Sequence, residues 1–429
     1  MKRLLALALA LMLMVVGCTA AVAEQEAFTL HWMIPYAEDH AISRTVALLV
    51  KKYQEEVNPN LVYQPEYMAD AEAYYQKLKI LIASNEAPDM FWGDPDTFTL
   101  SLRDQGMLYN VGELLEELDV VDQFMDITYA YPKYADGSLY LMTTGANTEY
   151  FWYHPSLFEK AGIEKMPETW DEFFVACEKL EATGVAPLTC MGAPWYLLRY
   201  AAFIPYRMTG NQFITDAISG EVSWGSEPGI AMGEFMQKIA GYFVEGWAGL
   251  DASSSRDYFL SGGAAMWYMT LSNAQNYVVD ENGDLVEDIA YFKLPTLDGY
   301  DATTSKDYFA NSGKGIMILQ ETVNEHEALI KDFVKFFVEN FGDIAVYDCM
   351  YLSGIKPANT KDLSDFQKQM YENFGEVGVD KYAHCWDVVI DAASNEVLKA
   401  EIVNLAIGEI TPEEFAKRMD AAIAENVDN

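Results

Sequence analysis

The sequence has few basic residues and few histidines. It contains 28 lysines and arginines against 66 aspartates and glutamates, which gives a formal net charge of -38. Such a surface repels nucleic acid, so we expect no nucleic-acid partner. The acidity favours solubility and argues against a polyanionic ligand.

Familiar catalytic and metal-binding motifs are missing as well. The five cysteines show no CxxC spacing, the five histidines form no HxxxH or HExxH pair, and neither a P-loop nor a nucleophile elbow occurs. A glycosidase needs two catalytic carboxylates held a short distance apart. A chain with 66 acidic residues always offers candidates for such a pair, so their presence is no evidence for catalysis. We therefore expect no catalysis, no metal and no cofactor. Cys177, Cys190, Cys349 and Cys385 are read either as containing one disulfide or as buried free thiols.

Long apolar runs are also scarce, and the one that occurs lies at the N-terminus. Residues 4–16 are apolar and follow Lys2 and Arg3, a pattern typical of a signal peptide and too short for a membrane span. The run ends in Val-Val-Gly-Cys, which resembles a bacterial lipobox. We predict a signal peptide over 1–17, lipidation of Cys18, a tether over 18–27 and anchoring to the cell membrane. The alternative is ordinary secretion with cleavage at Ala23.

What the chain does contain is an alternation of strands and helices. Strands are predicted over 28–34, 61–67 and 88–92, with helices over 42–57 and 74–83 between them. This rhythm favours a parallel sheet covered by helices.

A second alternating region starts near residue 139. Thr169 and Glu172 have the spacing of a capping box at the start of a helix. Further strands are predicted over 147–153, 264–269 and 315–319, and further helices over 227–243 and 325–341. A length of 429 residues suits two lobes, and the lack of a linker predicts several chain crossings between them.

Four segments occur in an order shared with a known family. They are residues 84–91, the run from 153 to 173, residues 259–266, and the segment from 294 to 337 that holds Gly313 and Gly315. Together they resemble the family 1 extracellular solute-binding proteins, the relatives of maltose-binding protein, over nearly the whole mature chain. His154 and Gly263 depart from the family pattern, which usually has Asn and Lys there.

The resemblance implies an α/β fold of the type II periplasmic-binding-protein class, in which two lobes enclose a cleft. Each lobe would be a mainly parallel sheet flanked by helices, with two or three hinge segments between them. We assign residues 28–143 plus about 300–345 to the first lobe, and 144–299 plus about 346–429 to the second.

The function implied is that of a monomeric receptor of an ABC importer. It would capture a sugar or oligosaccharide and deliver it to the transmembrane permease subunits. Ligand bound to both lobes would favour the closed form selectively. The alternatives are a glycan-binding sensor without transport, a receptor for a non-sugar solute and, last, an extracellular carbohydrate-active enzyme.

Candidate ligand contacts follow from the chemistry of sugars, whose C–H faces stack on aromatic rings and whose hydroxyls bond carboxylates and amides. Ligands bind beyond the carboxyl ends of strands in open α/β sheets. The resemblance adds the lobe crossing and three segments of the second lobe. The candidates are Tyr36, Glu38, Asp39, Trp92, Asp94, Asp96, Asn147, Trp195, Tyr196, Trp267, Tyr268, Met269 and Trp386.

Trp386 is expected to be the main stacking ring, and Arg199 and Arg256 are further candidates for hydroxyl contacts. Because side chains alternate along a strand, residues 267–269 cannot all face the cleft. Every candidate also has a structural reading: a solvated loop, a turn cap, helix packing or the core.

Overall fold

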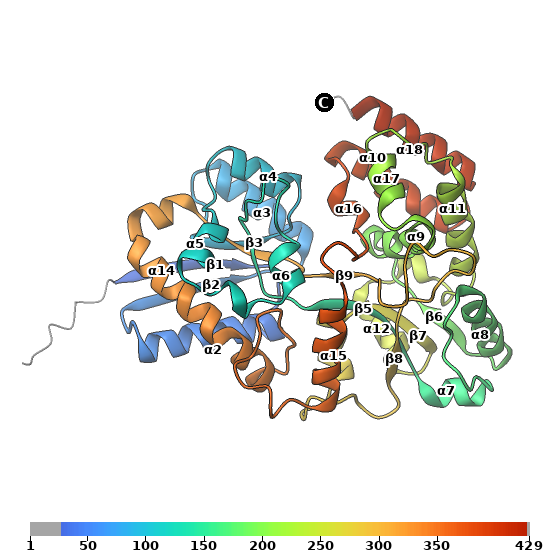
Figure 1. Ribbon diagram of the computed structural model, residues 1–429, viewed down its shortest axis with the longest axis horizontal. Coiled ribbons are helices and arrows are strands. Elements are labelled where there is room, and N and C mark those ends of the chain that lie inside the picture. The colour runs from blue at the N-terminus through green and yellow to red at the C-terminus, as the bar shows by residue number, and fades with distance from the viewer. Residues whose placement is uncertain (1–26, 427–429) are drawn as a thin grey trace, which may run out of the picture.

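The first lobe is built on a mixed five-stranded sheet in the order β2-β1-β3-β10-β4 (Figure 1). The computed structural model describes residues 27–426. Strand β1 pairs in parallel with β2 and β3, and β10 pairs antiparallel to β3 and β4. The strands are β1 (Phe28–Ile34), β2 (Leu61–Tyr67), β3 (Met90–Gly93), β4 (Met142–Thr143) and β10 (Gly315–Ile318).

Amphipathic helices cover this sheet. In α2 the residues Val46, Leu49, Val50 and Tyr53 recur at helical spacing and are buried. The helices of the first lobe are α2 (Ala41–Glu56), α3 (Ala71–Ala83), α4 (Thr97–Asp104), α5 (Val111–Glu117), α6 (Asp126–Ala130) and α14 (Gln320–Asp343). The predicted β-α-β-α-β order of this region is confirmed.

The second lobe contains a sheet in the order β6-β7-β5-β8, with β9 paired to β5. Strands β6 and β7 are parallel, whereas β5 is antiparallel to β7, β8 and β9. The α/β class is confirmed, but this sheet is mixed and not mainly parallel. The connections account for the antiparallel β5–β9 pair, since β5 leads away from the first lobe and β9 leads back to it. The strands are β5 (Asn147–Tyr153), β6 (Ala186–Thr189), β7 (Ala264–Thr270), β8 (Ala290–Phe292) and β9 (Ala310–Asn311).

Helices surround the second sheet and extend the lobe towards the C-terminus. Helix α8 begins with the predicted capping box: Glu172 N donates to Thr169 Oγ1 and Thr169 N donates to Glu172 Oε2, both at 3.3 Å. The helices are α7 (Pro155–Lys160), α8 (Trp170–Ala182), α9 (Pro194–Thr209), α10 (Gln212–Ile218), α11 (Glu227–Ala240), α12 (Ala252–Leu260), α13 (Leu271–Val278), α15 (Asp365–Glu376), α16 (Trp386–Val389), α17 (Ala392–Ala406) and α18 (Pro412–Asn426). Within residues 27–426 no helix has the length and apolar character needed to cross a membrane.

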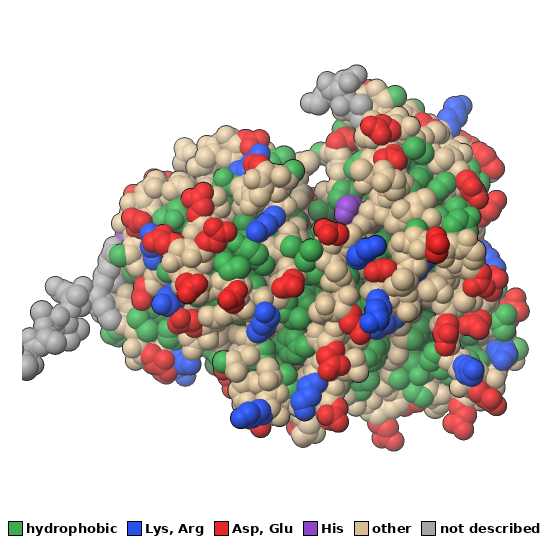
Figure 2. Space-filling model, in the orientation of Figure 1, with side chains coloured by type: hydrophobic (Ala, Val, Ile, Leu, Met, Phe, Trp, Pro, Cys, Tyr) green, Lys and Arg blue, Asp and Glu red, His purple; other side chains and the backbone are tan. Residues whose placement is uncertain are grey.

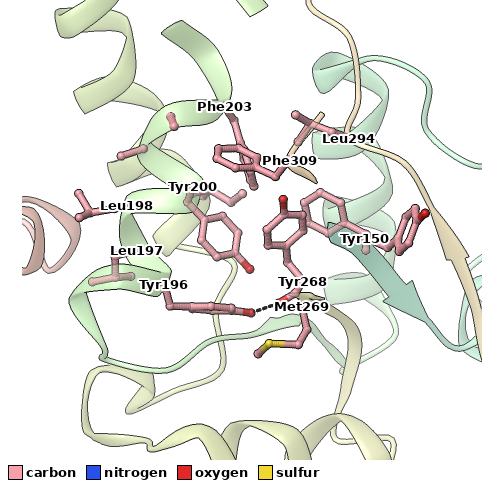
Figure 3. Close-up of a cluster of buried hydrophobic side chains, with 14 of the residues drawn as sticks. Tyr150, Tyr196, Leu197, Leu198, Tyr200, Phe203, Tyr268, Met269, Leu294 and Phe309 are labelled. Atoms are coloured by element: carbon pink, nitrogen blue, oxygen red, sulfur yellow. Dashed lines mark hydrogen bonds between the residues drawn. The ribbon is translucent and has the colours of Figure 1, made fainter. Parts of the chain in front are cut away.

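Each lobe has its own hydrophobic core. The core of the second lobe is rich in aromatic rings, and Figure 3 shows Tyr200, Phe203 and Tyr268 packed between α9 and the sheet. The four cysteines of the described chain are buried free thiols. The prediction of free thiols is therefore confirmed, and the alternative of one disulfide is wrong. Burial raises the pKa of the Cys385 thiol to about 12, so this thiol stays protonated at neutral pH.

Three segments of the chain cross between the lobes and lie side by side. Gly145 forms an isolated antiparallel bridge with Ser353, and Asn147 is paired with Asn311 where β5 meets β9. A Cβ built on Gly145 would lie 2.6 Å from the carbonyl oxygen of Ser312, so the backbones approach too closely for a side chain there. Several crossings, as predicted, therefore join the lobes.

Candidate functional site

The first wall of the site comes from the ends of β1 and β3. The Tyr36 ring stacks on His40 at 4.6 Å and meets the edge of Trp92 at 5.8 Å. His40 Nδ1 accepts a hydrogen bond from Ile42 N and so caps α2. Burial lowers the pKa of His40 to about 4, so the ring is neutral and can accept this bond at neutral pH. Tyr36 keeps part of its surface exposed, whereas Trp92 is fully buried behind it.

Asp94 is the centre of a polar cluster on the same wall. Tyr75 donates its hydroxyl hydrogen to Asp94 Oδ2 at 2.8 Å, and Lys314 Nζ forms an ion pair with the same oxygen. The carboxylate remains 29% exposed, so it can still reach a ligand. Asp96 has a structural task, since it caps α4 by accepting from Thr99 N at 3.0 Å.

The acidic side chains of Glu38 and Asp39 are exposed and face a different hollow. That hollow is open to solvent and lies on the first lobe beside α2 and the end of β2. Arg44, Leu48 and Tyr67 line it together with the two acids. The structure thus separates these two candidates from the Asp94 cluster.

The second wall is formed around Arg199 of α9. Its Nε donates to Glu149 Oε1 at 3.1 Å and its Nη1 donates to Asp387 Oδ1 at 3.2 Å. The guanidinium also lies 5.8 Å from the Trp195 ring and 5.5 Å from the Phe309 ring. Trp195 is only partly buried, so this wall offers an aromatic surface next to a fixed cation.

Burial acts on the two charges of this wall in different ways. It raises the pKa of Glu149, and Arg199 opposes the shift only in part. Burial also disfavours the Arg199 charge, but Cys385, Glu149 and Asp387 outweigh it and raise the pKa of the guanidinium. Arg199 is therefore a permanent cation held in place by carboxylates.

The floor between the walls is the crossing of β5 and β9. Asn147 Nδ2 donates to Asn311 Oδ1 at 3.3 Å, and Gly313 N donates to the same oxygen at 2.9 Å. Asn147 Oδ1 and Ser312 Oγ are buried and have no hydrogen-bond partner among the described residues. Buried polar atoms are rarely left without a partner, but these two have almost no accessible surface, so a bound molecule would reach them only if the crossing opened.

Tyr131 brings the two walls together. It follows α6, its ring lies 5.6 Å from Tyr382 of the second lobe, and burial raises the pKa of its hydroxyl, with the Cys385 thiol and the charged groups of Asp94 and Arg199 nearby. In Figure 1 α3 and α4 lie across from α16 at the top of the molecule, and the space-filling outline is notched between these parts (Figure 2). Sequence reasoning missed Tyr131, Tyr382 and Glu149 as site residues, because none of them lies in a recognisable motif. It also passed over Asp387, although this residue directly follows the candidate Trp386.

The remaining candidates lie in the core of the second lobe. Tyr196 donates its hydroxyl hydrogen to the Tyr268 carbonyl oxygen (Figure 3), and Tyr196, Trp267, Tyr268 and Met269 are all buried. Trp267 packs on Phe259, whereas Tyr268 packs on the Phe151 and Phe203 side of the sheet. Tyr196 and Tyr268 thus pack on the α9 side of the sheet, behind Trp195 and Arg199, whereas Trp267 lies on the opposite face.

Trp386 is also buried, with 3% of its surface exposed. Its ring packs edge-on against Trp224 at 5.5 Å and lies 6.1 Å from Phe213. Arg256 lies apart from Arg199, pairing with Asp257 and lying 4.3 Å from the Tyr277 ring. No group of three or more potential metal ligands occurs in the part of the chain that the structure describes.

The fold and the site define a two-lobed receptor whose polar and aromatic walls face each other across chain crossings. Residues 38–340 match the model of the bacterial extracellular solute-binding protein family. The chain belongs to this family, whose members are the non-catalytic solute receptors of ABC transporters. A comparison with curated proteins gives no match.

Solved structures share the fold at low sequence identity. One, from work on xylan utilization by the thermophilic bacterium Caldanaerobius polysaccharolyticus, has a TM-score of 0.79 and 22% identity, covering 92% of this chain and 99% of that one. A chitin oligosaccharide binding protein has the same TM-score and identity over 94% and 100% of the two chains. A solute-binding protein in complex with raffinose has a TM-score of 0.67 and 15% identity over 93% and 99%.

Proposed function

We propose that this receptor binds a sugar or oligosaccharide between its lobes and presents it to the permease of an ABC importer. One observation carries the proposal: each lobe supplies an aromatic ring and a hydrogen-bonded charged cluster to the same gap. Tyr36 and Asp94 come from the first lobe, Trp195 and Arg199 come from the second, and Tyr131 lies among them. Rings next to charged donors and acceptors match the faces and hydroxyls of a sugar. The structural relatives named for chitin oligosaccharide and raffinose support the same ligand class.

The exposure of each candidate residue determines its role in this proposal. Tyr36, Asp94, Asn147 and Trp195 would contact the ligand, together with Arg199, a further candidate from the sequence. The wholly or nearly buried candidates would be core residues of the two lobes, and Asp96 would hold the start of α4; the buried candidates are Trp92, Tyr196, Trp267, Tyr268, Met269 and Trp386. Glu38 and Asp39 would lie at the outer edge, towards their own hollow.

The experiment is a thermal-shift screen of the mature protein against a panel of neutral oligosaccharides. A ligand that binds only the folded state raises the melting temperature by mass action. We expect Trp195→Ala to lose most of the shift given by the best glycan, because the stacking face is gone. The matched control is Tyr258→Ala, which removes an exposed ring of α12 and should leave the shift unchanged.

Two outcomes would contradict the proposal. A panel in which no glycan raises the melting temperature would remove carbohydrate as the ligand. Steady release of reducing ends from an oligosaccharide would show an enzyme and not a receptor.

We also propose the placement of the mature chain and of its lobes. Lipidation at Cys18 would anchor it to the outer side of the cell membrane; that residue lies outside the described part of the structure. Labelling with a fatty acid tests it, since a Cys18→Ser chain would take up no label. The lobe bounds would follow the sequence, except that residues 300–311 stay with the second lobe, where β9 pairs with β5. Hinges would lie at the three crossings, and the receptor would act as a monomer.

A further inference from the structure

The basic side chains at the two walls are already paired with carboxylates. Lys314 Nζ contacts Asp94 Oδ2, with the two side chains 24% and 29% exposed. Arg199 contacts two carboxylates, those of Glu149 and Asp387. Around these two cations there are thus three carboxylates in direct contact.

Other groups at the walls add no positive charge. Asp96 lies beside the Asp94–Lys314 pair and adds a further carboxyl group. Burial lowers the pKa of His40 to about 4 and also lowers that of His384, so both rings are neutral at neutral pH. The walls together are acidic, in line with the net charge of the whole chain.

The net acidic charge of the walls has different consequences for neutral and for anionic ligands. A sugar hydroxyl can donate to Asp94 or Asp387 and accept from Arg199 or Lys314 without disturbing either ion pair. A carboxylate, sulfate or phosphate group can only accept, and it would stand against like charges in a partly buried site. It would have to break an existing pair to obtain a cation.

We infer that the site selects uncharged sugar residues and excludes sugars that carry a carboxylate, sulfate or phosphate. The inference rests on the proposed function and narrows it from carbohydrate to neutral carbohydrate. It follows from the pairing of Lys314 with Asp94 and of Arg199 with Glu149 and Asp387, which leaves both cations neutralised before a ligand arrives.

The test compares three forms of one glycan by isothermal titration calorimetry on the mature protein. They are the neutral oligosaccharide with the largest thermal shift, the same glycan carrying one uronate, and the methyl ester of that uronate. We expect the uronate to bind about tenfold more weakly than the neutral glycan, or worse. The ester has nearly the same shape without the charge, so it should bind within about threefold of the neutral form.

Two further measurements show whether charge causes the difference in affinity: one varies the ionic strength, and the other compares two variants. Raising the ionic strength should reduce the ratio of the affinities for the neutral glycan and for the uronate, because screening weakens the repulsion between the uronate and the acidic walls. Asp94→Asn should also narrow it, since Lys314 would then lack its anionic partner. The control Glu234→Gln removes an exposed acid on α11 and should leave the ratio unchanged.

The outcomes separate this inference from the function on which it rests. Equal affinity for the neutral glycan and its uronate would overturn the charge selection and leave the sugar receptor intact. An ester excluded as strongly as the uronate would show that shape, not charge, decides. If no neutral glycan bound at all, the proposed function itself would fail.

Discussion

Aromatic side chains serve two purposes in this protein, and residue type alone does not distinguish them. Trp92, Trp267 and Trp386 are buried at 0%, 2% and 3% exposure, whereas Trp195 keeps an accessible face. A stacking ring and a core ring are both large, flat and apolar, so the sequence predicts only where rings occur. The walls differ in the polar groups beside each ring, and those groups come from distant segments.

The partners of Arg199 on the second wall were likewise not predictable from residue type. Arg199 was a candidate from the sequence, but its partners Glu149 and Asp387 lie 50 and 188 positions away. No spacing rule links such residues, because the contact depends on how β5, α9 and α16 pack together. Asp94 was predictable, since it directly follows β3 at the carboxyl edge of the sheet.

Glu149 gives a prediction about pH. Burial raises its pKa above the ordinary value, so the folded protein binds this proton more tightly than the unfolded chain does. The resulting contribution to the free energy of unfolding is full below the unfolded pKa and is lost as the pH rises through the folded pKa. Glu149→Gln cannot titrate and lacks this contribution.

We therefore expect the unfolding free energy of the wild type to increase relative to that of Glu149→Gln as the pH is lowered from neutral towards 4.5, the ordinary pKa of a glutamate side chain. Urea titrations followed by tryptophan fluorescence measure both proteins at each pH. Glu234→Gln is the control for loss of an exposed acid. Parallel curves for wild type and Glu149→Gln would show that the buried carboxyl does not take up the proton.

At the scale of elements, local sequence patterns predicted where these strands and helices lie. The strands over 28–34 and 61–67 are found with the predicted bounds, and α2 and β5 agree within a residue. Helix α3 begins three residues earlier than predicted, because Asp70 caps it by accepting from Ala73 N. Strand direction was harder, since pairing of β10 with β3 joins segments more than two hundred residues apart.

The crossings give a prediction about packing. Gly354 lies against Thr128 and the Gly145 carbonyl so closely that no Cβ fits. We expect Gly354→Ala to lower the free energy of unfolding by about 1–3 kcal/mol through overpacking. Chemical denaturation with an unchanged m-value would attribute the loss to the folded state.

A matched glycine tests the reason for this loss. Gly375 lies in α15, and a Cβ added there would meet no neighbouring heavy atom within 4 Å. Gly375→Ala should raise stability by up to about 1 kcal/mol through helix propensity. If both alanines had the same effect, close backbone contact at the crossing would not be the cause.

At the scale of the whole molecule, the order of the motifs correctly predicted two α/β lobes, and the lack of a linker correctly predicted several crossings. Those motifs do not reveal how the lobes face each other, because Tyr131 and Tyr382 meet only after both lobes have folded. The proposed hinge motion follows from the arrangement of crossings in a narrow band between two separate cores.

Ligand should therefore change the shape of the molecule. We expect the radius of gyration from small-angle X-ray scattering to fall when the best neutral glycan is added, because contacts to both lobes favour the closed form. Trp195→Ala at the same glycan concentration is the control and should show little change. Identical profiles with and without a glycan that binds would exclude closure by hinge motion.

The strand order of the first lobe also constrains folding. Strand β10 lies between β3 and β4, yet it follows the entire second sheet in the sequence. Until that part of the chain is available, β3 and β4 have no shared neighbour and the sheet of the first lobe keeps an open edge. Completion of the first lobe must wait for residues 315–318 to emerge, so the later part of the chain determines when the earlier part becomes native.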